Sequence, residues 1–557
     1  MDRAPHSKDG NQKTLRERMV DVAEKINWIP KFGLERELDW LKNMHDWLIS
    51  KKNRFWGLAL PVWECKKCGN FEVVGSKLEL KEKTVEGWEE FSGKTPHKPQ
   101  IDKLKLKCSK CGEIISRIEP VGNPWLDAGI VSYSTVSENN KACNFIDNAT
   151  KPLYQTNKEE WKKWIPADFI TESFPGQFKN WFYSLIAMSS VLENMEPFKT
   201  VLGFATLLAE DGRPMHKSLG NAIEFNEGAQ KMGVDVMRFM YVRQNPADNL
   251  LFGYQIADET RRRFHLKLWN VYNFFVTYAN LYGWRPKSKK AKAKSTNILD
   301  RWILARLDKT ITLVTTSLEE HDASSASLEI EKFVDDLSVW YIRRSRGRVG
   351  ISAEDSNDKN DFYESTHRVL TSLSKLLAPF TPFMSDLIYM NLTKEESVHL
   401  SDWPVAVGVD DDELLEKMEK LREIVEKIHA KRKEIQLAVR QPLAKAEVTT
   451  DFTNFGEELT ELLKEEVNIK EIEWIKGEEV SVILDTNLTA ELEEEAKTRQ
   501  LIRMIQNQRK IKSIKITEEV LVTNDWFPES NNLTQLLKKT TSARKLSDGP
   551  FDVKRIS

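Results

Sequence analysis

The chain has 557 residues, of which 40% are hydrophobic and 30% charged, so it is long enough to form several domains with a core each. Its 83 Lys and Arg residues stand against 85 Asp and Glu residues, and the formal net charge of −2 excludes a strong overall field for nucleic acid, so any such contact must come from local basic clusters. No apolar run reaches the roughly 18 to 20 residues that cross a bilayer, and the polar segment 1–6 contains no signal-peptide core, so we expect a cytoplasmic protein without membrane contact.

The first half of the chain mixes helical and strand-like patterns. Apolar residues recur near helical spacing up to about residue 50, and the following segment 61–121 is β-rich and carries four cysteines. From about residue 161 to residue 252, short apolar runs such as 198–208 alternate with helical patterns. This alternation is typical of a parallel α/β layer.

The second half is dominated by helical patterns, which continue to about residue 433. Within them, the basic and apolar-poor segment 285–295 indicates a linker, for which a flexible surface loop and a phosphate-contacting segment are both open interpretations. Near the end, short strands such as 480–484 and a helix over 491–509 predict a small α+β domain.

Four of the five cysteines form two Cys-x-x-Cys pairs, Cys65 with Cys68 and Cys108 with Cys111, and a glycine follows each pair. The glycine lets the backbone fold back so that two thiolates converge, and two such turns supply a tetrahedral sulfur site. Because cytosolic chains keep thiols reduced, we expect a structural zinc ion with no open position for water. Four reduced thiols without a metal are the alternative. We interpret Cys143 as an ordinary thiol.

A polar loop bounded by glycines covers residues 210–221 and places Lys217 next to Ser218. A lysine in such a loop is usually only solvated, so the motif alone is a weak indication of a phosphate site. The loop follows a long apolar run and precedes a helix-forming segment, and this context favours a lysine that reaches a polyphosphate beside a helix start.

Residues 214–221, Pro-Met-His-Lys-Ser-Leu-Gly-Asn, resemble the mobile "KMSKS" loop of the class I aminoacyl-tRNA synthetases, which stabilises the ATP phosphates during amino-acid activation. An ordered series of further segments is similar to the isoleucyl type of that family. These segments are 27–30, 46–50, 54–57 and the zinc knuckle that begins at 62, followed downstream of the loop by 268–275, 335–346, 440–443 and 485–492.

The resemblance implies an α/β plus all-α fold, with a partial Rossmann-like catalytic domain, a zinc-binding insert, a helical anticodon-binding bundle and a small α+β C-terminal domain. The implied segments are a catalytic re-entry segment 1–60, the zinc-binding insert 61–121, the C-terminal half of the catalytic domain 122–252, the anticodon-binding domain 253–440 and the C-terminal domain 441–557.

The resemblance also implies the site residues. Lys217 and Ser218 would be catalytic, and ATP would enter as a substrate with Mg²⁺. The implied ATP- and adenylate-binding residues are Glu172, Gln177, Met215, His216, Lys217 and Ser218.

The chain also departs from the family's pattern. The family's first signature, His-Ile-Gly-His, is absent from the 557 residues, and so is the hydrolytic editing domain. In the loop, Pro214 replaces the family's first lysine and His216 its serine, and the segment 172–177, which resembles the family's Glu-Gly-x-Asp-Gln, has one extra residue before Trp181. Because adenylate formation depends on positioning and charge stabilisation, half of the phosphate clamp should give little rate, and we expect the chain alone to be inactive.

Aromatic and guanidinium groups interleave over residues 340–348, a pattern that can stack on splayed bases and pair with phosphates. A basic helix face packed by its aromatic residues is the alternative. The resemblance to the anticodon-binding bundle favours tRNA contact by Trp340, Arg343, Arg344 and Arg346.

Three hypotheses follow for the role of the chain. The leading one is half of a split isoleucine–tRNA ligase, whose partners are ATP, tRNA and a separate N-terminal half. The second is a non-catalytic paralogue that binds tRNA and has a decayed ATP site. The third is a truncated product of a longer gene.

Overall fold

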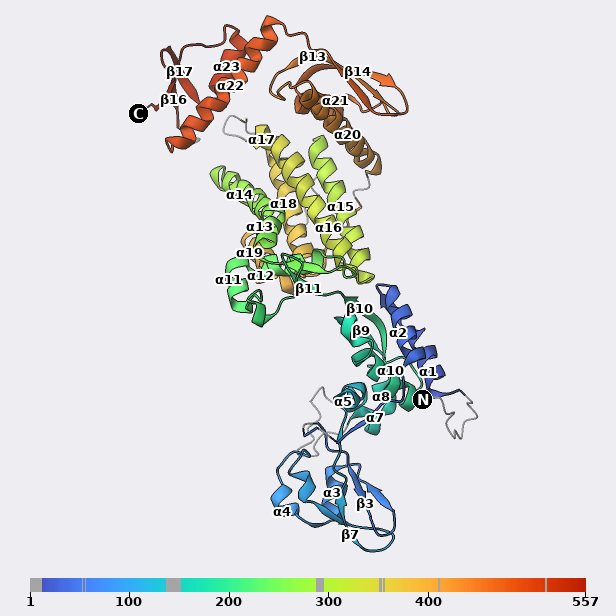
Figure 1. Ribbon diagram of the computed structural model, residues 1–557. Coiled ribbons are helices and arrows are strands. Elements are labelled where there is room, and N and C mark those ends of the chain that lie inside the picture. The colour runs from blue at the N-terminus through green and yellow to red at the C-terminus, as the bar shows by residue number, and fades with distance from the viewer. Residues whose placement is uncertain are drawn as a thin grey trace. The chain divides into compact units, whose positions relative to one another are not determined.

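Figure 1 shows the computed structural model of the chain. The structure describes residues 13–52, 54–55, 57–136, 152–286, 295–349, 353, 356–408, 411–515 and 518–556. The polar start, Trp56, Cys143 and residues 287–294 of the expected linker lie outside the described residues. The chain divides into two compact units, Met1–Ala222 with Gln244–Gly253 and Ile223–Arg243 with Tyr254–Ser557.

A three-stranded parallel sheet in the order β1-β10-β9 forms the centre of the first unit. Its strands are β1 (Asn27–Ile29), β10 (Phe198–Phe204) and β9 (Ala167–Ser173). The helices of this layer are α1 (Leu15–Ala23), α2 (Phe32–Asn43), α5 (Pro124–Gly129), α6 (Val131–Ser134), α7 (Leu153–Thr156), α8 (Lys158–Trp161), α9 (Phe174–Gln177) and α10 (Trp181–Leu192). The expected parallel α/β layer is confirmed by β9 and β10, and β1 joins it from much earlier in the chain.

An aromatic cluster holds the turn after β9. Phe174 opens α9, is buried, and its ring contacts those of Trp28 and Phe178. A Cβ atom on Gly203 would lie 1.7 Å from the Phe174 ring, so only glycine fits opposite this ring on β10. The cluster thereby fixes the carboxyl end of β9, which is the edge where parallel α/β sheets bind ligands.

The segment with the cysteines folds as a five-stranded antiparallel sheet in the order β4-β3-β7-β6-β5, which we call the cysteine module. Its elements are β3 (Val62–Glu64), β4 (Phe71–Val73), α3 (Lys77–Lys83), β5 (Thr84–Glu86), α4 (Trp88–Phe91), η1 (Ile101–Lys103), β6 (Lys105–Lys107) and β7 (Ile114–Arg117). Trp63 is fully buried in its core, and its indole N–H donates to the Leu104 carbonyl at 3.1 Å. The β-rich character expected for 61–121 is confirmed.

Two short strand pairs complete the first unit. β2 (Ser50–Lys51) pairs antiparallel with β8 (Val121–Gly122), so the chain enters and leaves the cysteine module side by side. β11 (Leu207–Ala209) pairs parallel with β12 (Leu250–Phe252), and the 3₁₀ turn η3 (Lys217–Leu219) lies between these two strands in the sequence.

The second unit is mainly helical. Its largest hydrophobic cluster runs from Phe239 to Ile472, and a separate cluster from Leu501 to Val553 lies in the last part of the chain. Its helices are α11 (Phe225–Met232), α12 (Val234–Arg243), α13 (Tyr254–Thr260), the π-helical η4 (Arg261–His265), α14 (Leu266–Leu281), α15 (Ile298–Glu319), α16 (Ala323–Asp335), the π-helical η5 (Asp336–Ile342), α17 (Arg343–Val349), α18 (Asn357–Leu377), α19 (Pro382–Thr393), η6 (Val398–Leu400) and α20 (Asp412–Glu434). No helix among the described residues is both long and apolar enough to cross a membrane.

Two small sheets end the chain. The first, in the order β14-β13-β15, contains β13 (Leu443–Thr450), β14 (Ile469–Lys476) and β15 (Ser481–Leu484), with α21 (Glu457–Val467) beside it. The second, in the order β17-β16-β18, contains β16 (Val520–Asn524), β17 (Ala543–Asp548) and β18 (Asp552–Arg555), with α22 (Ala490–Ile511) and α23 (Asn531–Thr541). The expected strand 480–484 and helix 491–509 are confirmed by β15 and α22.

Candidate functional site

Two matching turns carry the cysteine pairs. In the first, the Gly69 N–H donates to the Cys65 carbonyl at 2.9 Å, and in the second the Gly112 N–H donates to the Cys108 carbonyl at 2.9 Å. Both glycines have positive φ, 69° at Gly69 and 76° at Gly112, which is the conformation that folds the chain back towards the strand it left. The repeated turn brings the two pairs of thiols face to face.

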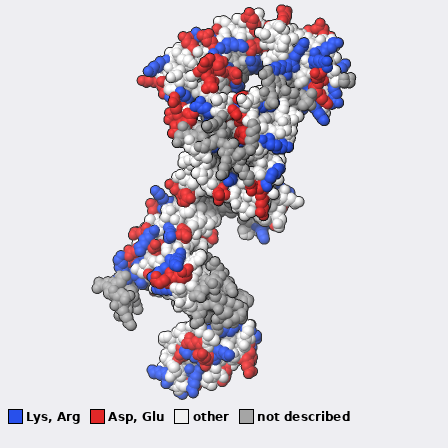
Figure 2. Space-filling model, turned by 180° about the vertical axis from the view of Figure 1, so that it is seen from behind, with Lys and Arg blue, Asp and Glu red and all other residues white. Residues whose placement is uncertain are grey.

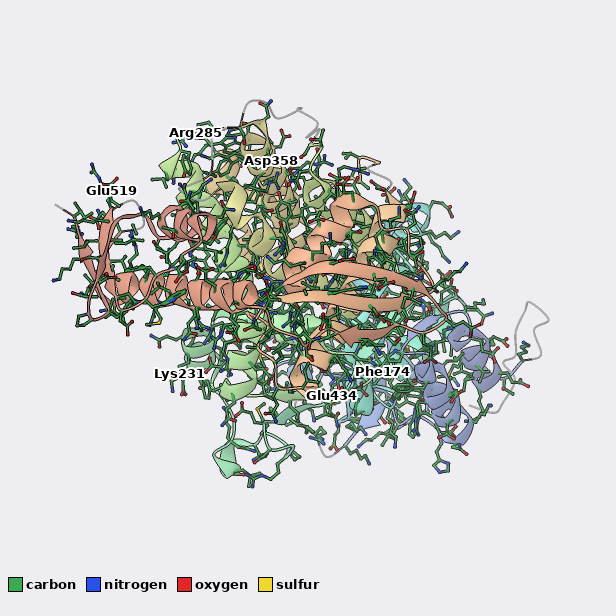
Figure 3. The ribbon with its side chains drawn as sticks, turned by 90° about the horizontal axis from the view of Figure 1, so that it is seen from above. Phe174, Lys231, Arg285, Asp358, Glu434 and Glu519 are labelled. Carbon is green, nitrogen blue, oxygen red and sulfur yellow. The ribbon has the colours of Figure 1, made fainter. Side chains whose placement is uncertain are left out.

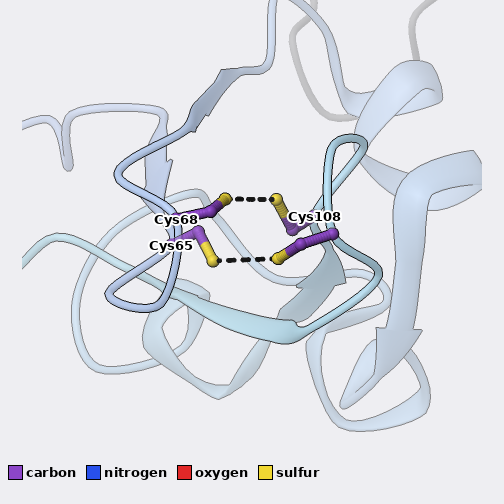
Figure 4. Close-up of side chains that lie close together, drawn as sticks. Cys65, Cys68 and Cys108 are labelled. Carbon is purple, nitrogen blue, oxygen red and sulfur yellow. Dashed lines mark hydrogen bonds between the residues drawn. The ribbon is translucent and has the colours of Figure 1, made fainter.

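The four sulfur atoms form one cluster in which every pair lies within 4.8 Å (Figure 4). The Sγ atoms of Cys65 and Cys111 are 3.5 Å apart, and those of Cys68 and Cys108 are 3.6 Å apart. A tetrahedral zinc site with Zn–S bonds of about 2.3 Å places its sulfurs about 3.8 Å apart. The cluster therefore has the size and ligand number of a closed thiolate metal site.

The electrostatics of the cluster favour a cation. The backbone N–H of Cys111, together with that of Lys110, lowers the pKa of the Cys108 thiol to about 6. Although a backbone N–H at Glu113 opposes the change, desolvation and the neighbouring sulfurs raise the pKa of Cys111 to about 12. The shifts of Cys108 and Cys111 are thus in opposite directions, and a divalent cation would offset the repulsion between thiolates in the cluster.

The loop 214–221, called the lysine loop below, is closed by the side chain of Asn221. The Asn221 amide donates to the Pro214 carbonyl at 3.0 Å, and its oxygen accepts the backbone N–H of His216 at 2.9 Å. Gly220, with φ 69°, ends the 3₁₀ turn η3. From the sequence, Asn221 is one of the retained loop residues that favour use of the ATP site, together with Lys217, Ser218 and Gly220, but its closure of the loop is not predicted. Amide side chains commonly bond to nearby backbone in this way.

His216 caps the turn that presents Lys217. Its Nδ1 accepts the backbone N–H of Ser218 at 3.3 Å and lies 2.6 Å from the Ser218 hydroxyl oxygen. In the neutral ring the proton therefore sits on Nε2. The imidazole thus accepts a backbone N–H at the start of the turn, which is a role that a serine hydroxyl commonly has. Lys217 and Ser218 are exposed and Met215 is half-buried, so the loop offers its cation to solvent.

Glu172 and Gln177 lie on a different element, at the carboxyl end of β9 and in α9. The Glu172 carboxylate accepts the backbone N–H of Ser173 at 2.7 Å, and the Gln177 side-chain oxygen accepts that of Trp181 at 3.3 Å. Both side chains are half-buried and bonded to their own turn, at the sheet edge where a nucleotide would lie.

The aromatic side chains of η5 pack inside the second unit, whereas Arg343 and Arg346 of α17 are exposed. Trp340 is 7% exposed, and the guanidinium of Arg422 lies 5.6 Å from the centre of its ring. Arg346 lies over the ring of Phe274 at 5.9 Å. In this structure Trp340 thus has little free ring surface, and its contact with tRNA stays a prediction.

The two preceding arginines point to the first C-terminal sheet. Arg343 pairs with the buried carboxylate of Glu466, and Arg344 pairs with Glu465 on the same helix, α21. Arg343 also donates from Nε to the Val339 carbonyl at 2.7 Å. These arginines therefore join α17 to α21, and their contact with tRNA likewise stays a prediction.

Arg348, which the sequence did not single out, is the most firmly held arginine of this segment. Its guanidinium donates to both carboxylate oxygens of Asp300 at 2.7 Å, and to Asp358, which Figure 3 labels. The Tyr341 hydroxyl also donates to Asp300 at 2.8 Å. This buried network fixes α15, α17 and α18 relative to one another.

Figure 2 shows Lys and Arg interspersed with Asp and Glu over the visible face of the described residues. This agrees with the net charge of −2 and leaves recognition of an anion to local groups.

Comparison with known proteins gives two family matches. The family described as tRNA synthetases class I (I, L, M and V) matches residues 10–251, and the anticodon-binding domain of tRNA ligase matches residues 300–448. The first match contains the sheet, the cysteine module and the lysine loop. The second covers nearly all of α15 and the helices α16 to α20 of the second unit.

Curated relatives of the chain are isoleucine–tRNA ligases. The protein of Clostridium tetani is 34% identical over 86% of this chain and 44% of its own length. That of Dehalococcoides mccartyi is 32% identical over 96% of this chain and 54% of its own length. Among solved structures, a LeuRS–tRNA–LeuAMS complex of Agrobacterium radiobacter aligns with a TM-score of 0.49 at 15% identity, over 92% of this chain and 51% of that chain.

The chain spans about half the length of the curated relatives it matches. Within that span, the two domain matches follow one another in the order in which the two parts of the fold occur. The chain therefore belongs to the class I aminoacyl-tRNA synthetases, as a class I synthetase domain joined to the anticodon-binding domain of tRNA ligases.

Proposed function

We propose that the chain takes part in the ATP-dependent activation of isoleucine and its transfer to tRNA in the cytoplasm, together with a separately encoded N-terminal half. The observation that carries this proposal is the lysine loop, which Asn221 holds closed and from which Lys217 projects into solvent. A preformed loop with an exposed lysine suits the β- and γ-phosphates of ATP, which enters with Mg²⁺.

The three-stranded sheet supports the proposal that strands from another half complete the nucleotide-binding sheet. Among the described residues, β9 pairs with β10 on one side and with no strand on the other. A nucleotide-binding sheet of the doubly wound type binds its ligand where strands from its two halves meet. We therefore place Glu172 and Gln177 on the adenylate side, Met215, His216, Lys217 and Ser218 on the phosphate side, and the rest of the adenine pocket on the N-terminal half.

We further propose that the cysteine cluster holds one structural zinc ion. Cys65, Cys68, Cys108 and Cys111 would supply four thiolates, and a closed tetrahedral site contributes folding energy rather than chemistry. The helical unit would hold tRNA, with Trp340, Arg343, Arg344 and Arg346 as the candidate contacts.

A second candidate function is a non-catalytic tRNA-binding paralogue. Pro214 and His216 stand where the family's loop carries a lysine and a serine, and the loss of one phosphate-contacting cation favours a decayed ATP site. The retained Lys217 and the intact loop closure by Asn221 favour use of the site.

Isoleucine-dependent exchange of pyrophosphate into ATP separates these functions. We expect no exchange from the chain alone and restored exchange when a His-Ile-Gly-His half is added. Full exchange by the lone chain would contradict the split enzyme. An inactive two-chain complex with intact tRNA binding would favour the paralogue.

A further inference from the structure

The strands that connect the cysteine module to the parallel sheet enclose an open pocket of about 490 Å³. We call it the neck pocket, because residues 48–59 lead into the module and residues 120–123 lead out of it. Its lining residues are Leu48, Ser50, Lys51, Lys52, Arg54 and Pro120.

Backbone bonds fix the walls of the neck pocket. Asn123 donates from its side chain to the Leu48 carbonyl at 3.0 Å and from its backbone N–H to the Ile49 carbonyl at 2.9 Å. On the outgoing strand, the Gly122 N–H donates to the Leu58 carbonyl at 2.6 Å. Because β2 and β8 also pair, the pocket is a preformed part of the connection rather than a gap between loose ends.

The charge of the neck pocket is one-sided. Lys51, Lys52 and Arg54 line it, and among the described residues no Asp or Glu does. None of the three cations has an ion pair within the described part of the chain, whereas Lys67, Lys83, Lys103 and Arg117 of the cysteine module each have one. Glu119 is next to Pro120 in the sequence but does not line the pocket. Three neighbouring cations repel one another, and an anion bound among them would relieve that repulsion.

The donor types match phosphate. Arg54 offers a planar fork of N–H donors, the two lysines offer mobile ammonium groups, and Ser50 adds a hydroxyl. Leu48, which is 60% exposed, and Pro120 give the pocket an apolar wall that can pack against a ribose or a base. An open pocket with both features suits a strand that passes through it better than a small molecule enclosed by it.

We propose that the neck pocket binds backbone phosphates of an RNA strand, a contact of the first unit in addition to any tRNA surface on the helical unit. The inference rests on the proposed function in so far as tRNA is the RNA that supplies the strand. Free polyphosphate has the same anionic chemistry, and the experiment below separates the two sources.

The test measures fluorescence anisotropy of a labelled single-stranded RNA of about ten nucleotides, within the usual site size, with the full chain over a range of salt concentrations. The pocket variant is Lys52→Ala with Arg54→Ala. The control variant is Lys25→Ala with Lys31→Ala, which removes the same charge from exposed positions of the first unit outside the pocket. We expect the pocket variant to weaken RNA binding about tenfold or more and to lower the salt slope by about 2, whereas the control changes neither.

A second arm titrates inorganic pyrophosphate against the bound RNA. If pyrophosphate displaces the RNA only at concentrations high enough to act through ionic strength, the result supports binding of an RNA strand in the neck pocket. If the pocket variant loses pyrophosphate binding but keeps RNA binding, the site belongs to free polyphosphate and the proposal is overturned. Equal RNA affinity in the pocket and control variants also overturns it.

Full-length tRNA distinguishes a failure of this site from a failure of the proposed function. If the chain binds no tRNA, the proposed function fails. The affinity of the pocket variant for the short RNA still tests the neck pocket in that case. If tRNA binds equally well to the wild type and to the pocket variant, the pocket fails and the proposed function stands.

Discussion

The cysteine turns and the lysine loop begin alike and are stabilised differently. Each follows a strand and contains a glycine with positive φ, at Gly69, Gly112 and Gly220. In the cysteine turns the functional atoms point inward and lie within 4.8 Å of one another. In the lysine loop, Lys217 points to solvent, and a single side chain, that of Asn221, bonds the two ends of the loop together.

The difference teaches how each site would work. Four converging ligands build a metal site from within one module, so the metal and the fold stabilise each other. An exposed loop held by two hydrogen bonds of one amide can open and close at a cost of a few kcal/mol, and its lysine acquires a fixed position only against a ligand. The first site should therefore respond to mutation with loss of structure, and the second with loss of rate.

Removal of the metal should give the largest effect. Structural zinc contributes on the order of 10 kcal/mol to the folding of small modules, so Cys108→Ser should unfold the cysteine module and leave the helical unit folded. Metal content should fall from about one zinc per chain to none, with loss of the buried environment of Trp63 measured by its fluorescence. Ser109→Ala, in the same turn, is the control and should keep its zinc. A metal-free wild type, purified reduced and without chelator, would contradict the zinc site.

Lys217→Ala should reduce turnover of the two-chain complex by a factor of about 100 to 1000, the size expected for loss of one transition-state charge contact. Zinc content and tRNA affinity should stay unchanged, because Lys217 contacts neither site. The control is Lys231→Ala, which removes an exposed lysine that is paired with Glu227 on α11. Equal turnover in the two variants would remove Lys217 from the reaction.

Asn221→Ala tests the closure of the lysine loop without any assay of activity. It removes two hydrogen bonds of about 1 kcal/mol each, so the loop should open more often and trypsin should cleave after Lys217 about 10 to 30 times faster. Asn221→Asp keeps the acceptor for His216 and loses the donor to Pro214, so its cleavage rate should lie between those of the wild type and Asn221→Ala. A cleavage rate that does not change in either variant would show that other contacts close the loop.

The sequence predicted best where function depends on local spacing. Two Cys-x-x-Cys-Gly turns place the thiols of Cys65 and Cys108 by backbone geometry alone, and the parallel layer follows from apolar runs that alternate with helices. The pairing of β1 with β10 is not visible in this way, because the two strands are separated by more than half of the first unit. Only tertiary packing decides such a contact.

The arginine segment shows that a sequence pattern does not predict which distant residues its side chains contact. Interleaved aromatic and arginine residues predict a nucleic-acid surface, but they equally fit a helix that pairs with acidic residues far along the chain. Glu465 and Glu466 lie on α21, more than a hundred residues after Arg343 and Arg344, and no local pattern connects them. Likewise, no local pattern connects Arg348 with the carboxylate of Asp300, with which it forms an ion pair.

The last prediction decides whether Arg343 and Arg344 act on tRNA or only on α21. If they contact phosphate, Arg343→Ala with Arg344→Ala should weaken tRNA binding about fivefold to tenfold and lower the salt slope by up to about 2, measured by filter binding or anisotropy. The matched variant is Glu465→Gln with Glu466→Gln, which breaks the same ion pairs and keeps the arginines. It should leave the salt slope unchanged, because no cation is lost.

A purely structural role predicts a different pattern. Both double variants would then break the junction between α17 and α21 and lower the free energy of unfolding by a similar amount, about 1 to 2 kcal/mol after allowance for the exposed side of these pairs. Because the geometry of the helical unit would change alike in both, tRNA affinity would fall alike in both. A loss of affinity and of salt slope confined to the arginine variant would instead assign these side chains to tRNA, as loss of rate without loss of structure would assign Lys217 to ATP.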